Sequence, residues 1–135
     1  MTAKSGDEWT YCGKRVQNLP REVRIDQRAA TLALETCDLT RAHLSSSDAR
    51  LRAEETTGYR SIVGQLFYLA TWSRQDMACA VSLATQRAKV AAVADLAAVN
   101  KLVVETRGRA DMHRCFRHGL PDMLQGHRVC ARTRR

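Results

Sequence analysis

Apolar residues recur at helical spacing in the middle of the chain. Those between residues 59 and 72 fall at i, i+4 and i+7 or beside these positions: Ile62, Val63, Leu66, Leu69 and Ala70. This spacing predicts a helix over Tyr59–Trp72 with one buried face. Arg60, Gly64 and Tyr68 fall at i, i+4 and i+8 on the opposite side, so we expect them to face outward.

Two more helices are predicted after the first. The second starts near Ser73 and Asp76, a pair spaced like a capping box, and runs to about residue 88. The third covers Val93–Thr106, with Asp95 in its first turn, where a negative charge complements the helix dipole. Their expected core positions are Met77, Val81, Ala84, Leu96, Val99 and Val103. Three amphipathic helices with short connections predict an antiparallel bundle.

The pattern before the helices is typical of strands. Tyr11–Gln17 is predicted as a short strand broken by Gly13, and residues 18–21 have turn chemistry. Residues 22–26 alternate, with Val23 and Ile25 on one face, which completes a β-hairpin. Asp26 can cap a short helix over residues 27–35. The predicted fold class is α+β, mostly α: a short N-terminal hairpin, a three-helix bundle and a disordered basic tail.

These patterns divide the chain into five parts. Residues 1–8 are predicted to be disordered, 9–36 form the hairpin and short helix, and 59–106 form the bundle. Residues 37–58 are predicted to be a loop or hinge, although a helical turn around Asp48–Glu55 is the alternative. Residues 107–135 show no sustained period and are predicted to be disordered.

The net charge of +8 is concentrated in this tail. Residues 107–135 hold eight arginines but only two acidic residues, Asp111 and Asp122, so the rest of the chain is nearly neutral. Such a tail is either a solvated end or a segment that binds polyanions through counterion release.

Cysteine usage and hydropathy bear on location. The five cysteines are odd in number and widely spaced, which favours reduced thiols in an intracellular chain of the cytoplasm or nucleus. No apolar run is long enough to span a bilayer, and the N-terminus lacks the apolar region of a secretory signal. We therefore expect no membrane partner.

The tail also contains two Cys/His pairs. Cys115 and His118 are separated by two residues, as are His127 and Cys130, a spacing that can supply zinc ligands. The main expectation is nevertheless that no metal is bound and that the pairs reflect composition. No nucleophilic triad and no glycine-rich phosphate loop is present in the sequence.

The segment YRSIVGQLFYLATWSRQDMACAVSLATQ, Tyr59–Gln86, resembles a block of copia-type retrotransposon Pol polyproteins. That block has the form Tyr-Arg-Ser-(Leu/Ile)-(Val/Ile)-Gly-x-Leu-x-Tyr-Leu followed by Arg-x-Asp, and it lies in the reverse transcriptase region, downstream of the catalytic aspartates. Residues 11–15 and 24–27 are similar to the primer-grip hairpin, and residues 94–102 to the helix that enters the connection region. The resemblance covers roughly residues 9–106. It departs from the family at Gln75, where a Pro is usual, and at Ala29–Thr31.

The resemblance implies contact with a template–primer duplex of RNA or DNA. Thumb helices of reverse transcriptases pack against the minor groove, so Arg60, Gly64 and Tyr68 would face nucleic acid. The remaining implied contacts are Gly13, Lys14, Arg15 and Arg74. An alternative for Gly64 is close packing on a neighbouring helix, since glycine otherwise costs about 1 kcal/mol in a helix interior.

The carboxylates of a polymerase are missing. Two-metal nucleotidyl transfer needs aspartates that hold both ions, yet the sequence has no Asp-Asp pair and no Asp-x-Asp. We therefore predict a non-enzymatic, degenerate reverse transcriptase fragment without a cofactor, although the parent enzyme would use Mg²⁺, and with at most non-specific duplex binding. The alternatives are a small helical interaction module that self-associates through an exposed helical face, and a translation of a decayed element without function.

Overall fold

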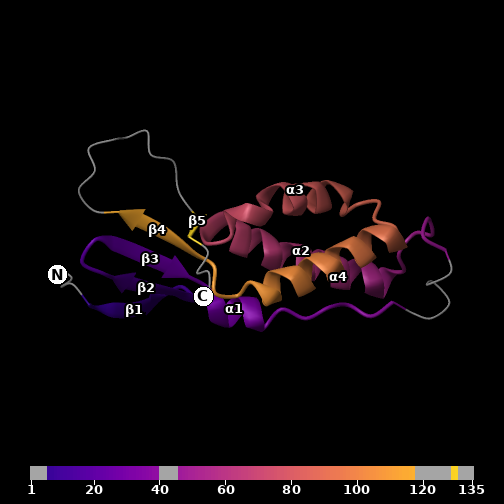
Figure 1. Cartoon of the computed structure of the whole chain (residues 1–135). Helices are drawn as coiled ribbons and strands as arrows, with labels where there is room; N and C mark the ends of the chain where they lie inside the picture. The colour runs from indigo at the N-terminus through magenta and orange to yellow at the C-terminus, as the bar shows by residue number, and fades with distance from the viewer. Residues whose placement is uncertain (1–5, 40–45, 118–128, 131–135) are drawn as a thin grey trace.

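An antiparallel sheet lies beside one end of a helical bundle (Figure 1). The computed structural model describes residues 6–39 and 46–117, together with the backbone of residues 129 and 130. The sheet has five strands in the order β1-β2-β3-β4-β5. The predicted α+β, mostly helical class is confirmed.

The first two strands form a tight hairpin. They are β1 (Glu8–Tyr11) and β2 (Lys14–Asn18). Cys12 and Gly13 between them have φ values of 48° and 72°, the left-handed pair that a two-residue hairpin turn requires. The prediction of one strand over residues 11–17, broken at Gly13, was wrong, because the glycine forms the turn itself.

The third strand, β3 (Glu22–Asp26), pairs with β2 and places Val23 and Ile25 on one face, as predicted. The backbone of Gly6 and Asp7 hydrogen-bonds to Asn18, and Glu8 already belongs to β1. The predicted disorder is therefore wrong for residues 6–8, while residues 1–5 lie outside the described part.

The predicted disordered tail is also wrong for residues 107–117 and for the backbone of residues 129 and 130. β4 (His113–Arg117) pairs with β3, and β5 (Val129–Cys130) pairs with β4. The edge of β3 offers unpaired backbone groups, and β4 satisfies them although its arginine-rich sequence has little strand character. Residues 118–128 and 131–135 lie outside the described part.

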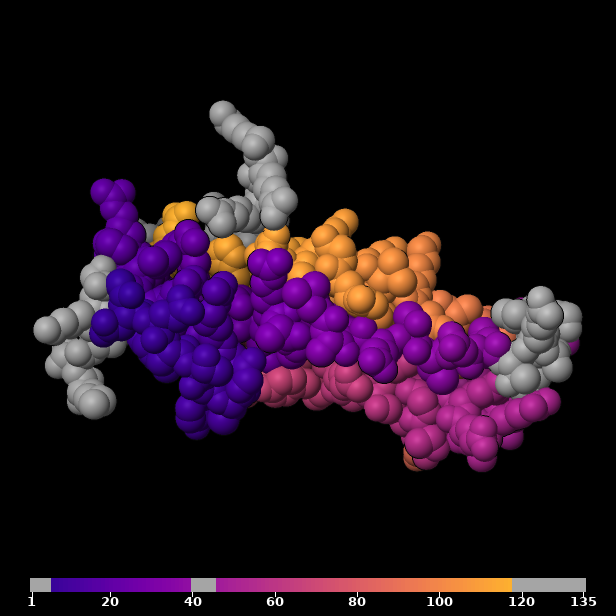
Figure 2. Space-filling view, turned by 90° about the horizontal axis from the view of Figure 1, so that it is seen from below, coloured from indigo at the N-terminus to yellow at the C-terminus, as the bar shows by residue number. Residues whose placement is uncertain are grey.

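A short helix and an extended strap follow β3. The helix is α1 (Arg28–Leu32), shorter than the predicted 27–35. In the strap, Leu34 is buried in the core, and the side-chain amide of Asn100 both accepts from and donates to the backbone of Cys37, at 3.0 and 2.7 Å. Figure 2 shows this purple segment running between the orange and magenta helices along the length of the bundle.

The predicted loop 37–58 is only partly a loop. The first long helix, α2 (Ala53–Trp72), begins at Ala53 and not at Tyr59, because the Glu55 carboxylate accepts the backbone N–H of Arg52 at 2.9 Å. The helical alternative at Asp48–Glu55 is correct only from Ala53 onward, since Ala49 and Leu51 instead pair with the backbone of residues 91–93. Residues 40–45 lie outside the described part.

Three helices form the bundle. A 3₁₀ turn, η1 (Gln75–Met77), leads from α2 into α3 (Ala78–Arg87), and α4 (Val93–Gly108) follows. The predicted stripe on α2 and the predicted core residues of α4 are all buried. The predicted cap at Ser73 was wrong, because its hydroxyl donates to Gln27 Oε1 at 2.8 Å and Asp76 instead binds Arg74.

Candidate nucleic-acid interface

The outer face of α2 is open at Gly64. Arg60 and Gly64 are exposed, and Tyr68 is 38% exposed. Among the described residues, a β-carbon added at Gly64 would meet no atom of another element within 4 Å, so the alternative of close packing on a neighbouring helix is wrong. Arg60 donates to the carbonyl of Ala88 at 3.4 Å and otherwise projects from the same face.

The hairpin turn meets α2 at the end of this face. The Tyr68 hydroxyl donates to the carbonyl of Cys12, and a β-carbon on Gly13 would lie 3.9 Å from the Tyr68 oxygen. The structure thus brings Gly13, Lys14 and Tyr68 together although they are far apart in sequence. It adds Trp72, which the sequence analysis missed; its position one turn after Tyr68 was the available signal.

Lys14 is enclosed by two aromatic rings. Its ammonium lies 3.2 Å from the ring centroid of Trp72 and 5.9 Å from that of Tyr68, and the residue is only 8% exposed. Such cation–π contacts anchor a chain segment when the cation is desolvated. Lys14 therefore docks the hairpin on α2 and is not available as a phosphate contact.

Arg15 remains at the surface with a partner. Its side chain is 45% exposed and lies 2.7 Å from Asp26 Oδ2. The hydrogen bond to Asp26 is the main cause that raises the pKa of the Arg15 guanidinium. Part of its charge is balanced within the sheet, so its attraction for a phosphate is reduced.

Arg74 is buried, which corrects its assignment to nucleic-acid binding. It is 2% exposed and forms a two-pronged pair with Asp76 at 3.0 and 3.1 Å. Its remaining nitrogen donates to the carbonyls of Thr106 and Arg109 at 3.1 and 3.0 Å, at the C-terminal end of α4. Arg74 therefore holds the bundle together and is not available to a ligand.

The structure describes only part of the alternative zinc site. Cys115 is buried on β4, and Cys130 stands opposite His113 in the backbone register, while His118 and His127 lie outside the described residues. Within the described residues, no three His, Cys, Asp or Glu side chains are grouped so that they could hold a metal ion.

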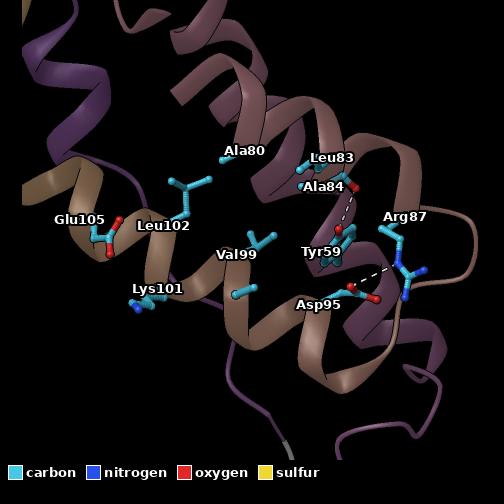
Figure 3. Close-up of a pocket in the computed structure, with 11 residues that line it drawn as sticks. Tyr59, Ala80, Leu83, Ala84, Arg87, Asp95, Val99, Lys101, Leu102 and Glu105 are labelled. Carbon is cyan, nitrogen blue, oxygen red and sulfur yellow. Dashed lines mark hydrogen bonds and ion pairs between the residues drawn. The ribbon is translucent and has the colours of Figure 1, made fainter. Parts of the chain in front are cut away.

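A second feature is a groove between α3 and α4, which sequence analysis did not find. It encloses about 390 Å³ (Figure 3). Its apolar lining includes Leu83, Val99 and Leu102, and charged residues stand at both ends. At one end Arg87 pairs with Asp95 at 3.3 Å, and at the other lie Lys101 and Glu105.

Tyr59 closes the inner side of this groove. Its hydroxyl donates to the carbonyl of Ala84 at 2.7 Å (Figure 3). Burial is the main cause that raises the pKa of the Tyr59 phenol above its ordinary value.

Comparison of the chain with protein-family models, with curated proteins and with solved structures found no match. Among the helices of the described residues, none combines the length and the apolar character needed to cross a bilayer.

Proposed function

We propose that this chain is a non-catalytic remnant of a copia-type reverse transcriptase that binds double-stranded nucleic acid without sequence preference. The observation that carries the proposal is the bare backbone at Gly64, exposed on the outer face of α2, where no described residue outside its own turn of helix lies near the missing side chain. A helix that keeps glycine there loses about 1 kcal/mol relative to alanine, and no internal packing offsets that loss.

A wide, shallow minor groove suits this surface. The minor groove of an A-form duplex admits a helix backbone and is contacted through shape, sugar and phosphate. Arg60 lies one turn before Gly64 and supplies the charge, while Tyr68 lies one turn after it and supplies a flat, amphipathic side chain. Arg60, Gly64 and Tyr68 are thus the proposed contacts, with Arg15 in a supporting role.

The test measures binding to a fluorescently labelled RNA–DNA hybrid by anisotropy. Gly64→Gln fills the bare position and is expected to weaken binding by about tenfold. Ala97→Gln adds the same side chain to an exposed position on α4 and serves as the matched control. Arg60→Gln should lower the slope of affinity against salt by about one.

Equal affinities of Gly64→Gln and Ala97→Gln would contradict the proposal, as would binding that does not weaken with salt. No nucleotidyl transfer is proposed, because the sequence lacks the paired aspartates. Incorporation of labelled nucleotide on a primed template by the purified chain would overturn that part.

A second candidate function is self-association through the groove between α3 and α4. Leu83 is 58% exposed beside the groove, which is apolar along its length. In a two-fold pair with antiparallel α3 helices, the Arg87 end of one copy would approach the Glu105 end of the other. We expect salt-insensitive dimers in size-exclusion chromatography that Leu83→Glu abolishes; a monomer at all concentrations would exclude this function.

A further inference from the structure

The aromatic residues of this chain lie almost entirely on its surface. The sequence has two Phe, two Trp and three Tyr, and all lie in the described residues. Tyr59 is the single one in the core. The others are between 38% and 68% exposed: Trp9, Tyr11, Phe67, Tyr68, Trp72 and Phe116. Large aromatic side chains normally contribute to a core, so this distribution calls for a role at the surface.

Most of these rings belong to one continuous surface, which we call the aromatic strip: Trp9, Tyr11, Tyr68, Trp72 and Phe116. Directly opposed residues of an antiparallel sheet place their side chains on the same face. The register aligns Trp9, Val16, Ile25 and Arg114 across four strands, and aligns Val23 with Phe116. Tyr11 opposes Lys14, whose ammonium contacts Tyr68 and Trp72, so the sheet face continues onto α2.

The charge on this face of the sheet has one sign. Among the described strand residues that share the face with Trp9, the charged ones are Arg114 and Lys14, and the ammonium of Lys14 is enclosed by Tyr68 and Trp72. The guanidinium of Arg114 lies 5.0 Å from the Phe116 ring centroid. On the opposite face, Arg15 pairs with Asp26 and Arg24 pairs with Glu22, so positive and negative charges balance there.

We infer that the aromatic strip binds single-stranded nucleic acid by stacking unpaired bases on its rings. Proteins that bind single strands without sequence preference combine exposed aromatic rings with positive charge along the backbone path. The strip has exposed rings and the positive charge of Arg114, and it carries no acidic side chain among its described sheet residues, which favours a polyanion over a protein partner. This ligand differs from the duplex proposed for α2, and only Tyr68 belongs to both surfaces.

The chain carries its own reporter for the test. Trp9 and Trp72 are its two tryptophans, and both lie in the strip. Titration with an oligothymidylate of about sixteen nucleotides, the upper end of common site sizes, is expected to quench their fluorescence. An abasic deoxyribose-phosphate oligomer of the same length has the same charge without bases, and it should bind weakly and leave the fluorescence unchanged.

Three variants test whether the ring of Tyr11 contacts the oligonucleotide. Tyr11→Thr removes an exposed ring while keeping a good strand former, and should weaken oligothymidylate binding about five- to a hundred-fold. Tyr11→Phe retains the ring and should bind like the wild-type chain, which separates loss of stacking from loss of fold. Phe67→Leu removes an exposed ring outside the strip and should leave affinity unchanged.

Equal binding of the abasic oligomer, or unchanged affinity of Tyr11→Thr, would overturn the inference. Oligomers that form without nucleic acid and disappear in Tyr11→Thr would also overturn it, because the strip would then be a protein interface. Gly64→Gln should weaken duplex binding and leave oligothymidylate binding intact. The single-strand and duplex proposals can therefore fail separately.

Discussion

Two glycines of α2 occupy opposite environments. A β-carbon added at Gly58 would lie 2.6 Å from the Cys37 sulfur, whereas one added at Gly64 would meet nothing within 4 Å. Both positions gain helix propensity from alanine, but only Gly64 has room for the methyl group. The two sites therefore separate backbone propensity from steric fit within a single helix.

We predict opposite signs for the two alanine substitutions. Gly64→Ala should raise the free energy of unfolding by about 0.5–1 kcal/mol. Gly58→Ala should lower it by about 1–3 kcal/mol, because the methyl group overpacks the contact with Cys37. Urea denaturation followed by circular dichroism measures both values.

The role of Cys37 is checked in a double-mutant cycle. Removing the sulfur with Cys37→Ala should make Gly58→Ala neutral or stabilising, since the space is vacated. A Gly58→Ala penalty that persists in the Cys37→Ala background would contradict the proposed clash.

Single-residue predictions from the sequence succeeded where periodicity decides and failed for two cations whose partners are remote in sequence. The inner and outer faces of α2 follow from helical spacing, so Leu66 is buried and Gly64 exposed as predicted. Lys14 and Arg74 were expected to contact nucleic acid because of the resemblance to reverse transcriptases, but both are buried. Their partners, Trp72 and the end of α4, come from other parts of the fold and leave no local sequence signal.

At the scale of elements, Arg74 joins three segments. Its guanidinium binds Asp76 in η1 and two carbonyls at the C-terminal end of α4, while its own backbone N–H donates to Leu69 in α2. The last carbonyls of a helix have no partner within the helix, and a cationic side chain there also meets the negative end of the helix dipole.

Loss of this side chain should destabilise the bundle. Arg74→Met leaves Asp76 without its ion-pair partner and the carbonyls without donors, and is expected to cost about 3 kcal/mol. Arg74→Lys should recover only part of this, because an ammonium cannot bridge the same set of acceptors. Arg60→Met, at an exposed position, should change unfolding by less than about 0.5 kcal/mol in the same urea titration. Similar values for Arg74→Met and Arg60→Met would contradict the capping role.

The elements themselves were predictable to different degrees. The three long helices were found because each carries a sustained apolar stripe. β4 was missed because its strand conformation depends on pairing with β3, and the whole helical bundle separates the two strands in sequence. The start of α2 was missed because residues 53–58 carry no stripe of their own and depend on the Glu55 cap. The aromatic strip needs strand register and the α2 contact together, so no local pattern reveals it.

At the scale of the whole molecule, stability should fall at alkaline pH. Burial is the main cause that raises the pKa of Tyr59 from its ordinary 10.0, and likewise that of Cys37 from 9.0. Both groups therefore keep their protons in the folded chain at pH values where the unfolded chain has lost them. The unfolded state then binds fewer protons, so the free energy of unfolding decreases as pH rises above about 9.

Tyr59→Phe should change this dependence in two ways. Loss of the hydrogen bond to Ala84 is expected to cost about 1 kcal/mol at neutral pH. Above pH 10 the variant should lose stability less steeply than the wild-type chain, because one of the two linked protons is absent. Urea midpoints across alkaline pH measure the slope, with Tyr11→Phe as a control for an exposed hydroxyl. A slope unchanged by Tyr59→Phe would rule out this linkage.

The position of β4 next to β3 has a consequence for how the chain is made. A ribosome synthesises residues 27–112 after β3 and before β4. The edge of β3 that pairs with β4 therefore stays unpaired until the entire bundle has been synthesised. Pairing of β4 with β3 is a long-range contact. Its cost in loop-closure entropy falls once the helices have folded and brought the two ends of residues 27–112 together. Destabilising substitutions in the bundle, far from any strand, should therefore lengthen the time for which the unpaired edge of β3 can pair with other nascent chains.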